Sequence, residues 1–172
     1  MELELVELGR LTGQDWTDLV EGEPEPFGPM GADLEWRPKD RHVALRARDG
    51  RLVAVEGAVV AEVVIADKLR LEVVGIGSVV VRRSRRGQGL MSRLVEPLRQ
   101  LAQEMGPDHA MLFCRPGLVD LYRGLGYAEI AAPVWADQPQ GRIEMPQVAM
   151  WQALRTGAEW PPGRVDVCGL PF

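Results

Sequence analysis

Apolar and polar residues follow two strand-like patterns along the first half of the chain. Residues 2–8 alternate glutamate with apolar side chains, which is typical of a strand with one face in water. Residues 42–48 and 51–65 lie on either side of Asp49-Gly50, a dipeptide that favours a tight hairpin turn. A further apolar run covers 69–81, so these segments predict an antiparallel meander.

Apolar positions three and four residues apart predict three helices. Thr12 is suited to cap the first, a short helix with acidic residues near its start. The second covers 90–105, where Pro97 is expected to introduce a kink. The third begins near Pro116 and stops before Gly126, which is placed as the left-handed residue after a helix.

Irregular segments and short strands complete the chain. Residues 23–41 are rich in proline and glycine, which predicts a long loop that is either one wall of a ligand pocket or a lid over the core edge. Residues 109–114 form a short apolar strand, and 130–154 contain one or two closing strands. The apolar residues of the tail, 160–172, predict that it docks on the domain.

Composition is typical of a globular domain from a reducing compartment. The 172 residues carry a net charge of -5, and the sequence pI near 5.1 opposes nucleic-acid binding. No apolar run approaches the ~20 residues of a membrane span, and the start of the chain lacks the basic region of a signal peptide. Cys114 and Cys168 have no metal-ligand spacing, so we expect free thiols and no metal. We therefore expect one cytoplasmic domain over residues 1–172, without a membrane partner.

The stretch from Val79 to Leu94 is predicted to form a strand, a turn and a helix, with arginine and glycine in the turn. A helix that begins at Gly87 or Gly89 presents unpaired backbone N–H groups and a favourable dipole to an anion. The arginines of 82–86 can add charge-assisted hydrogen bonds, so a pyrophosphate would fit here. The alternatives are an ordinary basic turn and an RNA contact. The acidic pI and the missing stacking aromatics oppose the RNA contact.

Two segments resemble signature motifs of the Gcn5-related N-acetyltransferase (GNAT) family. Arg86-Gly87-Gln88-Gly89-Leu90-Met91 is similar to the acyl-CoA-binding segment of that family, Arg/Gln-x-x-Gly-x-Gly/Ala, and departs from it at Met91. Leu121-Tyr122-Arg123-Gly124-Leu125-Gly126-Tyr127 is similar to a second family segment, Leu-Tyr-x-x-x-Gly-Phe/Tyr. The order of the two segments and the secondary structure predicted for them also agree with the family.

The resemblance implies an α+β fold, with a mixed, mainly antiparallel sheet of six or seven strands, helices on both faces and CoA in a split between two central strands. It further implies that acetyl-CoA is the acyl donor, with no metal, and that an amine of a small molecule or peptide attacks the thioester directly. A homodimer is plausible on the same grounds, and a sensor domain that binds acyl-CoA without turnover is the alternative function. The residues implied in cofactor binding are Val79, Val80, Val81, Arg86, Gly87, Gln88, Gly89, Leu90, Met91 and Ser92.

The resemblance also implies catalytic roles. The tyrosine of the second segment is Tyr122, and a phenol with a pKa of about 10 can protonate a departing thiolate. The position of the glutamate that many members use as a base is occupied here by Gly75, so the base is left open. Glu56 and Glu62 are candidates, although a surface position is the commoner interpretation for each. His42 at a strand start and water alone are further candidates. The last candidate is the C-terminal carboxylate of Phe172, because some larger members of the superfamily place their chain terminus in the active site.

Overall fold

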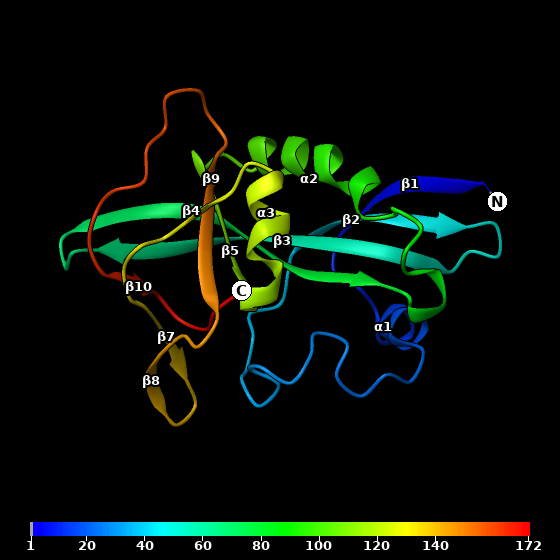
Figure 1. Cartoon of the computed structure of the whole chain (residues 1–172). Helices are drawn as coiled ribbons and strands as arrows, with labels where there is room; N and C mark the ends of the chain where they lie inside the picture. Colours follow the sequence, from blue (N-terminus) through cyan, green and yellow to red (C-terminus); the bar gives the residue numbers. More distant parts are fainter. Residues whose placement is uncertain (1) are drawn as a thin grey trace.

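Ten β-strands form one curled, mixed sheet in the computed structural model, which describes residues 2–172 (Figure 1). The prediction of six or seven strands was too low because residues 130–154 contribute three strands instead of one or two, and the tail adds another at Val165–Val167. The strands are β1 (Leu3–Leu8), β2 (Arg41–Ala47), β3 (Leu52–Ile65), β4 (Leu69–Val81), β5 (His109–Cys114), β6 (Ala128–Glu129), β7 (Val134–Gln138), β8 (Gly141–Glu144), β9 (Val148–Ala153) and β10 (Val165–Val167). The helices are α1 (Gly13–Val20), α2 (Ser92–Glu104) and α3 (Val119–Gly124), with short 3-10 turns η1 (Arg83–Arg85) and η2 (Pro116–Leu118).

The strand order of the sheet is β6-β9-β5-β4-β3-β10-β7-β8, and β1 and β2 extend it beside the first half of β3. All neighbouring strands are antiparallel except the pairs β4–β5 and β10–β7. The 14-residue strand β3 is long enough to pair with β2 through its first half and with β10 through its end. The predicted α+β class and the mainly antiparallel sheet are therefore confirmed.

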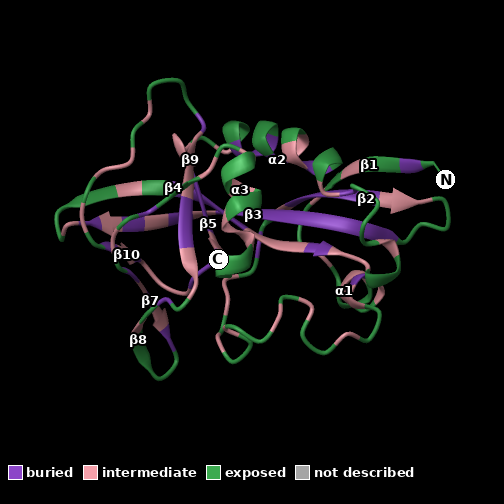
Figure 2. Ribbon diagram, viewed as in Figure 1, coloured by how far each residue is buried: buried purple, intermediate pink, exposed green. Residues whose placement is uncertain are grey.

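Helices cover both faces of the sheet, as predicted (Figure 1). Successive residues of a strand point to opposite faces. On β2, Val43 belongs to the apolar cluster that contains Leu94 of α2, whereas the adjacent Ala44 belongs to the cluster that contains Leu19 of α1. Burial is concentrated on the central strands between these helices, and the outer side of α2 is exposed (Figure 2). No helix within residues 2–172 has the length and apolar character needed to cross a membrane.

The helix ends follow local sequence signals. Thr12 caps α1, and a reciprocal hydrogen bond with Asp15 completes a capping box. Helix α2 begins at Ser92, two residues later than predicted, because the two preceding residues belong to the turn, and it continues through Pro97 to Glu104. The chain therefore leaves β4, makes the glycine turn and enters a helix, in the predicted order.

The sheet splits between β4 and β5. These parallel strands are paired only from Val74 to Ile76 on β4, although β4 continues to Val81. Ser78 adopts a positive φ of 54°, which is uncommon for a residue with a side chain and marks an irregular strand. Beyond Ile76, no strand of the described residues pairs with the edge of β4 that faces β5. This split organises the candidate site.

Candidate active site

Two glycines with positive φ shape the turn between β4 and α2. Gly87 has a φ of 76° and Gly89 a φ of 69°, a region that favours glycine. A Cβ on Gly87 would meet no atom within 4 Å, so the backbone is open there. Ser92 closes the turn because its hydroxyl donates to the Gly89 carbonyl oxygen at 2.6 Å. Leu90 is buried in the core, so its contribution to an anion site is limited to its backbone.

Two glutamates that follow α1 hold the basic side of this turn. The Glu23 carboxylate accepts two hydrogen bonds from the Arg86 guanidinium, at 3.1 and 2.5 Å. Glu21 accepts from the backbone N–H and the hydroxyl of Ser84, at 2.9 and 2.7 Å. These bonds lower the pKa of both carboxyl groups, through Ser84 for Glu21 and through Arg86 for Glu23. The Arg86 side chain was predicted to face a pyrophosphate, but in this structure it pairs with Glu23.

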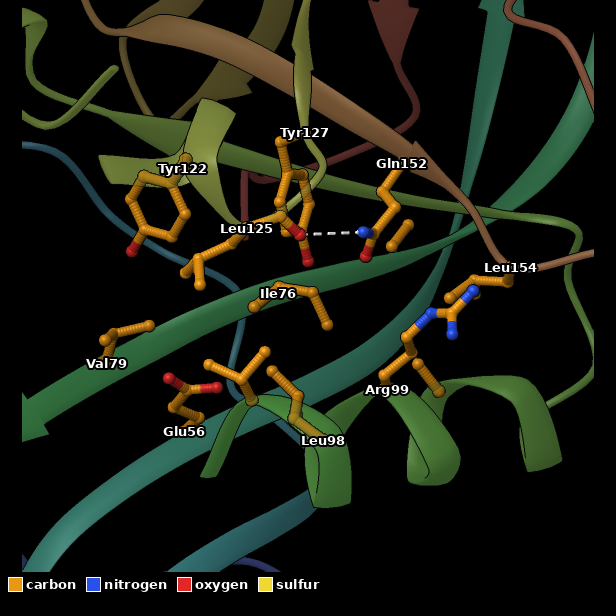
Figure 3. Close-up of a pocket in the computed structure, with 13 residues that line it drawn as sticks. Glu56, Ile76, Val79, Leu98, Arg99, Tyr122, Leu125, Tyr127, Gln152 and Leu154 are labelled. Carbon is orange, nitrogen blue, oxygen red and sulfur yellow. Dashed lines mark hydrogen bonds between the residues drawn. The ribbon is translucent and has the colours of Figure 1, made fainter. Parts of the chain in front are cut away.

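A cavity lies beside the split, between α2, α3 and the central strands (Figure 3). Tyr122 from α3, Val79 from β4 and Glu56 from β3 face this cavity. Of the other two valines predicted to line the cofactor, Val80 instead packs in the cluster beneath α1, and Val81 packs at the edge of the core. The remaining lining residues are Ile76, Val95, Leu98, Arg99, Ala102, Ala110, Leu125, Tyr127, Gln152 and Leu154.

Burial sets the acid strength of the tyrosines in this cavity. The rings of Tyr122 and Tyr127 meet edge to face, with centroids 5.8 Å apart. Desolvation raises the pKa of both phenols above the usual value, and the charge of Glu56 raises them further. Tyr122 is therefore protonated at neutral pH, which a proton donor requires.

Glu56 is a buried residue, which corrects the prediction of a surface glutamate. Only 5% of it is exposed, and burial raises the pKa of its carboxyl group to about 8. The pairing of β3 with β4 shifts register between Val55 and Gly57, and the intervening Glu56 points into the cavity (Figure 3). Glu62, further along the same strand, is partly exposed and forms an ion pair with Arg70, so the surface prediction holds for that glutamate.

Two glycines leave room for buried basic side chains on the face of β3 and β4 that is opposite to the Tyr122 cavity. Gly57 and Gly77 are paired across these strands, and a Cβ on either would approach Lys39 closely. The Lys39 ammonium donates to the Arg37 carbonyl oxygen at 2.7 Å, and desolvation lowers its pKa to about 8. His42 is also buried, with Nδ1 2.6 Å from a backbone carbonyl oxygen, and desolvation lowers its pKa. His42 therefore has a structural role in the core and does not face the Tyr122 cavity.

The C-terminal segment docks on this same face, as its apolar residues predicted. The backbone N–H of Arg37 donates to the Pro171 carbonyl oxygen at 2.6 Å. The Arg37 guanidinium donates to the Cys168 carbonyl oxygen at 2.5 Å. The ring of Phe172 is 2% exposed and packs against Phe113 with centroids 5.3 Å apart. Residues 168–172 are therefore fixed by both hydrogen bonds and packing.

Phe172 packs against Gly75 of β4, the position at which the resemblance implies a glutamate in many family members. A methyl group on Gly75 would overlap the Phe172 ring, so only glycine leaves room for it. A methyl group on Gly77 would lie 3.2 Å from the carboxyl carbon of Phe172 and 3.1 Å from the Lys39 ammonium nitrogen. The structure thus places the carboxyl carbon of Phe172 beside β4, where the split begins.

The long loop between α1 and β2 borders the end of β5. Trp36 meets the ring of Phe113 at 6.1 Å, and the Gln147 side-chain amide donates to the Met30 carbonyl oxygen at 3.2 Å. Phe27 and Met30 are apolar but exposed, with exposed fractions of 50% and 39%. The loop therefore lies against the end of β5, and none of its described residues lines the Tyr122 cavity.

Both cysteines are free thiols, as predicted. Cys114 is buried with its sulfur 3.7 Å from that of Met150, and desolvation raises the pKa of the thiol to about 11. Cys114 is therefore an inert core residue. Within residues 2–172, no three histidine, cysteine, aspartate or glutamate side chains gather in a way that could hold a metal ion.

Comparisons with known proteins agree with this architecture. The family model described as "Acetyltransferase (GNAT) family" matches residues 8–127. The GNAT family N-acetyltransferase YhbS from Escherichia coli, solved in complex with CoA, has a TM-score of 0.62 at 16% identity, with 99% of this chain and 97% of that chain covered. An acyl-CoA N-acyltransferase from Pseudomonas aeruginosa has a TM-score of 0.55 at 22% identity, covering 88% and 100% of the two chains. The ribosomal-protein-S18-alanine N-acetyltransferase from Escherichia coli has a TM-score of 0.55 at 16% identity, covering 92% and 99%. A search of curated proteins found no match.

The fold is shared, at low identity, with solved structures of N-acetyltransferases and of an acyl-CoA N-acyltransferase. Because the family model covers more than half of the residues, the chain belongs to the acetyltransferase (GNAT) family. Family and fold together support acyl-CoA-dependent N-acyltransfer as its general activity.

Proposed function

We propose that this protein transfers an acetyl group from acetyl-CoA to a primary amine of a small molecule or peptide. One observation carries the proposal: the split between β4 and β5 has the glycine turn at one end and the Tyr122 cavity beside it. The turn supplies backbone N–H groups and a helix start for a pyrophosphate, and the free edge of β4 can hold an extended pantetheine chain. The residues proposed for binding are Val79 through Val81 and Arg86 through Ser92.

The proposed reaction is direct attack of the amine nitrogen on the thioester carbonyl. The C–N bond forms, the C–S bond breaks, and the electron pair of that bond leaves with sulfur. Tyr122 donates its phenolic proton to the sulfur. The carboxylate of Phe172 lies on the opposite face of the sheet from Tyr122, beside Gly77, and accepts the proton from the nitrogen where the split between β4 and β5 opens. This base assignment applies to a polypeptide that terminates at Phe172.

The acceptor is proposed to enter past the loop between α1 and β2. That loop carries the exposed apolar side chains of Phe27 and Met30 together with several acidic residues. An acidic, partly apolar wall favours an acceptor that carries additional positive charge. The homodimer and the cytoplasmic location remain predictions.

Release of free thiol from acetyl-CoA in the presence of amines tests this function. We expect a polyamine, an amino acid or a peptide N-terminus to raise the rate of thiol release above that of acetyl-CoA with protein alone. Mass spectrometry should then find the acceptor heavier by one acetyl group. Saturable acetyl-CoA binding without thiol release for any amine in a broad panel would favour the alternative, a sensor domain.

A further inference from the structure

The buried carboxyl group of Glu56 has no partner in the part of the chain that the structure describes. It forms neither a hydrogen bond nor an ion pair there, although only 5% of the residue is exposed. Within residues 2–172, the fully buried side-chain atoms without a hydrogen-bond partner are Gln147 Oε1 and Trp160 Nε1, so the carboxyl oxygens of Glu56 keep some accessible surface in the cavity. The group points into the cavity that Tyr122 also faces (Figure 3).

Desolvation keeps this carboxyl group protonated near neutral pH because its pKa is raised to about 8. A protonated carboxyl group is a hydrogen-bond donor, unlike a carboxylate. It is also a stronger acid than Tyr122, whose pKa burial raises above the usual value. After Tyr122 gives up its proton, the resulting buried phenolate would therefore take one from Glu56.

The other charged or titratable groups around this cavity lie on or directly after α2, α3 and β5. Arg99 lies on α2, and Tyr127 follows α3. Cys114 and Arg115, at the end of β5, act electrostatically on Tyr122. Glu56 is the one carboxyl group among the residues that line the cavity in the described chain.

We propose that Glu56 is the proton reservoir of the reaction and reprotonates Tyr122 as Tyr122 protonates the departing CoA sulfur. This inference rests on the proposed acyl transfer. The C–S bond breaks, sulfur keeps the electron pair and takes the phenolic proton, and the phenolate oxygen takes the Glu56 proton. The remaining Glu56 carboxylate regains a proton from solvent before the next turnover.

The pH dependence of the variant Glu56→Gln tests this role. The ratio of wild-type kcat to variant kcat cancels the titration of the acceptor amine and of any other base. We expect a ratio of about 10–100 below pH 8 that falls toward 1 as the pH rises through the pKa of Glu56, since only the protonated form can act as a reservoir. A ratio that rises through the same range would mean that Glu56 is a base, and a constant ratio would mean that it has no acid-base role. Either result overturns the proposal.

Glu62→Gln is the matched control because Glu62 lies on the same strand but outside the cavity. Its kcat ratio should not change with pH. Thiol release by the wild-type protein distinguishes failure of the Glu56 role from failure of the proposed acyl transfer. If the wild type is active and the Glu56 ratio is constant, only this inference fails, whereas no thiol release with any amine overturns the acyl transfer and this inference with it.

Melting temperatures give a readout that does not depend on activity. Glu56 loses its proton near pH 4.5 in the unfolded chain and near pH 8 in the folded protein. The contribution of this carboxyl group to the free energy of unfolding therefore decreases between these two pH values and is constant above them. Glu56→Gln lacks this titration, so its melting temperature relative to wild type should rise from pH 5 to pH 8. A difference that is independent of pH would show that Glu56 is ionised in the folded protein and would contradict the proposal.

Discussion

Replacement of Tyr122 by phenylalanine is expected to lower kcat by about 10²–10⁴-fold, the usual range for loss of a general acid. The departing thiolate would then have no positioned proton donor in the cavity. The KM for acetyl-CoA should change little, because the glycine turn that is proposed to bind the pyrophosphate is untouched. Steady-state thiol release at saturating amine measures both constants.

Tyr127→Phe is the matched control for this variant. Tyr127 also lines the cavity, has a raised pKa and meets Tyr122 edge to face, so its substitution removes the same kind of hydroxyl group. We expect a much smaller loss of kcat for Tyr127→Phe. Equal losses would indicate a general disturbance of the cavity, and a Tyr122→Phe variant with wild-type kcat would remove Tyr122 from the mechanism.

A glycine added after Phe172 is expected to lower kcat by about 10²-fold or more, within the range for loss of a positioned base. The Phe172 ring would keep its place against Gly75, while the terminal carboxylate would move one residue away from Gly77 and Lys39. The loss should be smaller at high pH, where more of the amine is already deprotonated. A pH profile of kcat for the extended and the original chain makes the comparison.

Phe172→Leu controls for packing because it keeps an apolar side chain and the position of the carboxylate. This variant should lose stability through poorer contact with Phe113, but it should retain most of the wild-type kcat at temperatures where it is folded. If the added glycine leaves kcat unchanged, the carboxylate of Phe172 is not the base. Water or another group must then accept the proton.

Local sequence signals predicted the elements that carry the proposed cofactor site. The bounds of β4 agree with the predicted run 69–81, and the capping role of Thr12 is confirmed. Gly87 and Gly89 have the positive φ angles that a glycine turn before a helix suggests. These features depend on nearby residues, so the sequence contains most of the information that determines them.

Features that depend on long-range pairing escaped prediction. The burial of Glu56 follows from a register shift between two strands, and simple alternation along β3 does not reveal such a shift. The pairing of Arg86 with Glu23 joins a turn to a distant loop, and the strand β10 exists because the tail meets both β3 and β7. The glycines at 57, 75 and 77 were the available signal for a close approach, but they did not identify Lys39 and Phe172 as the side chains involved.

Thermal melting with acetyl-CoA, free CoA and ATP tests the central claim, that the glycine turn and the split form an acyl-CoA site. A ligand at 100 times its dissociation constant stabilises the native state by about 2.7 kcal/mol, which is a shift of several degrees for a domain of this size. We predict this shift with acetyl-CoA and with CoA, and none with ATP. No shift with acetyl-CoA, or an equal shift with ATP, would contradict the claim.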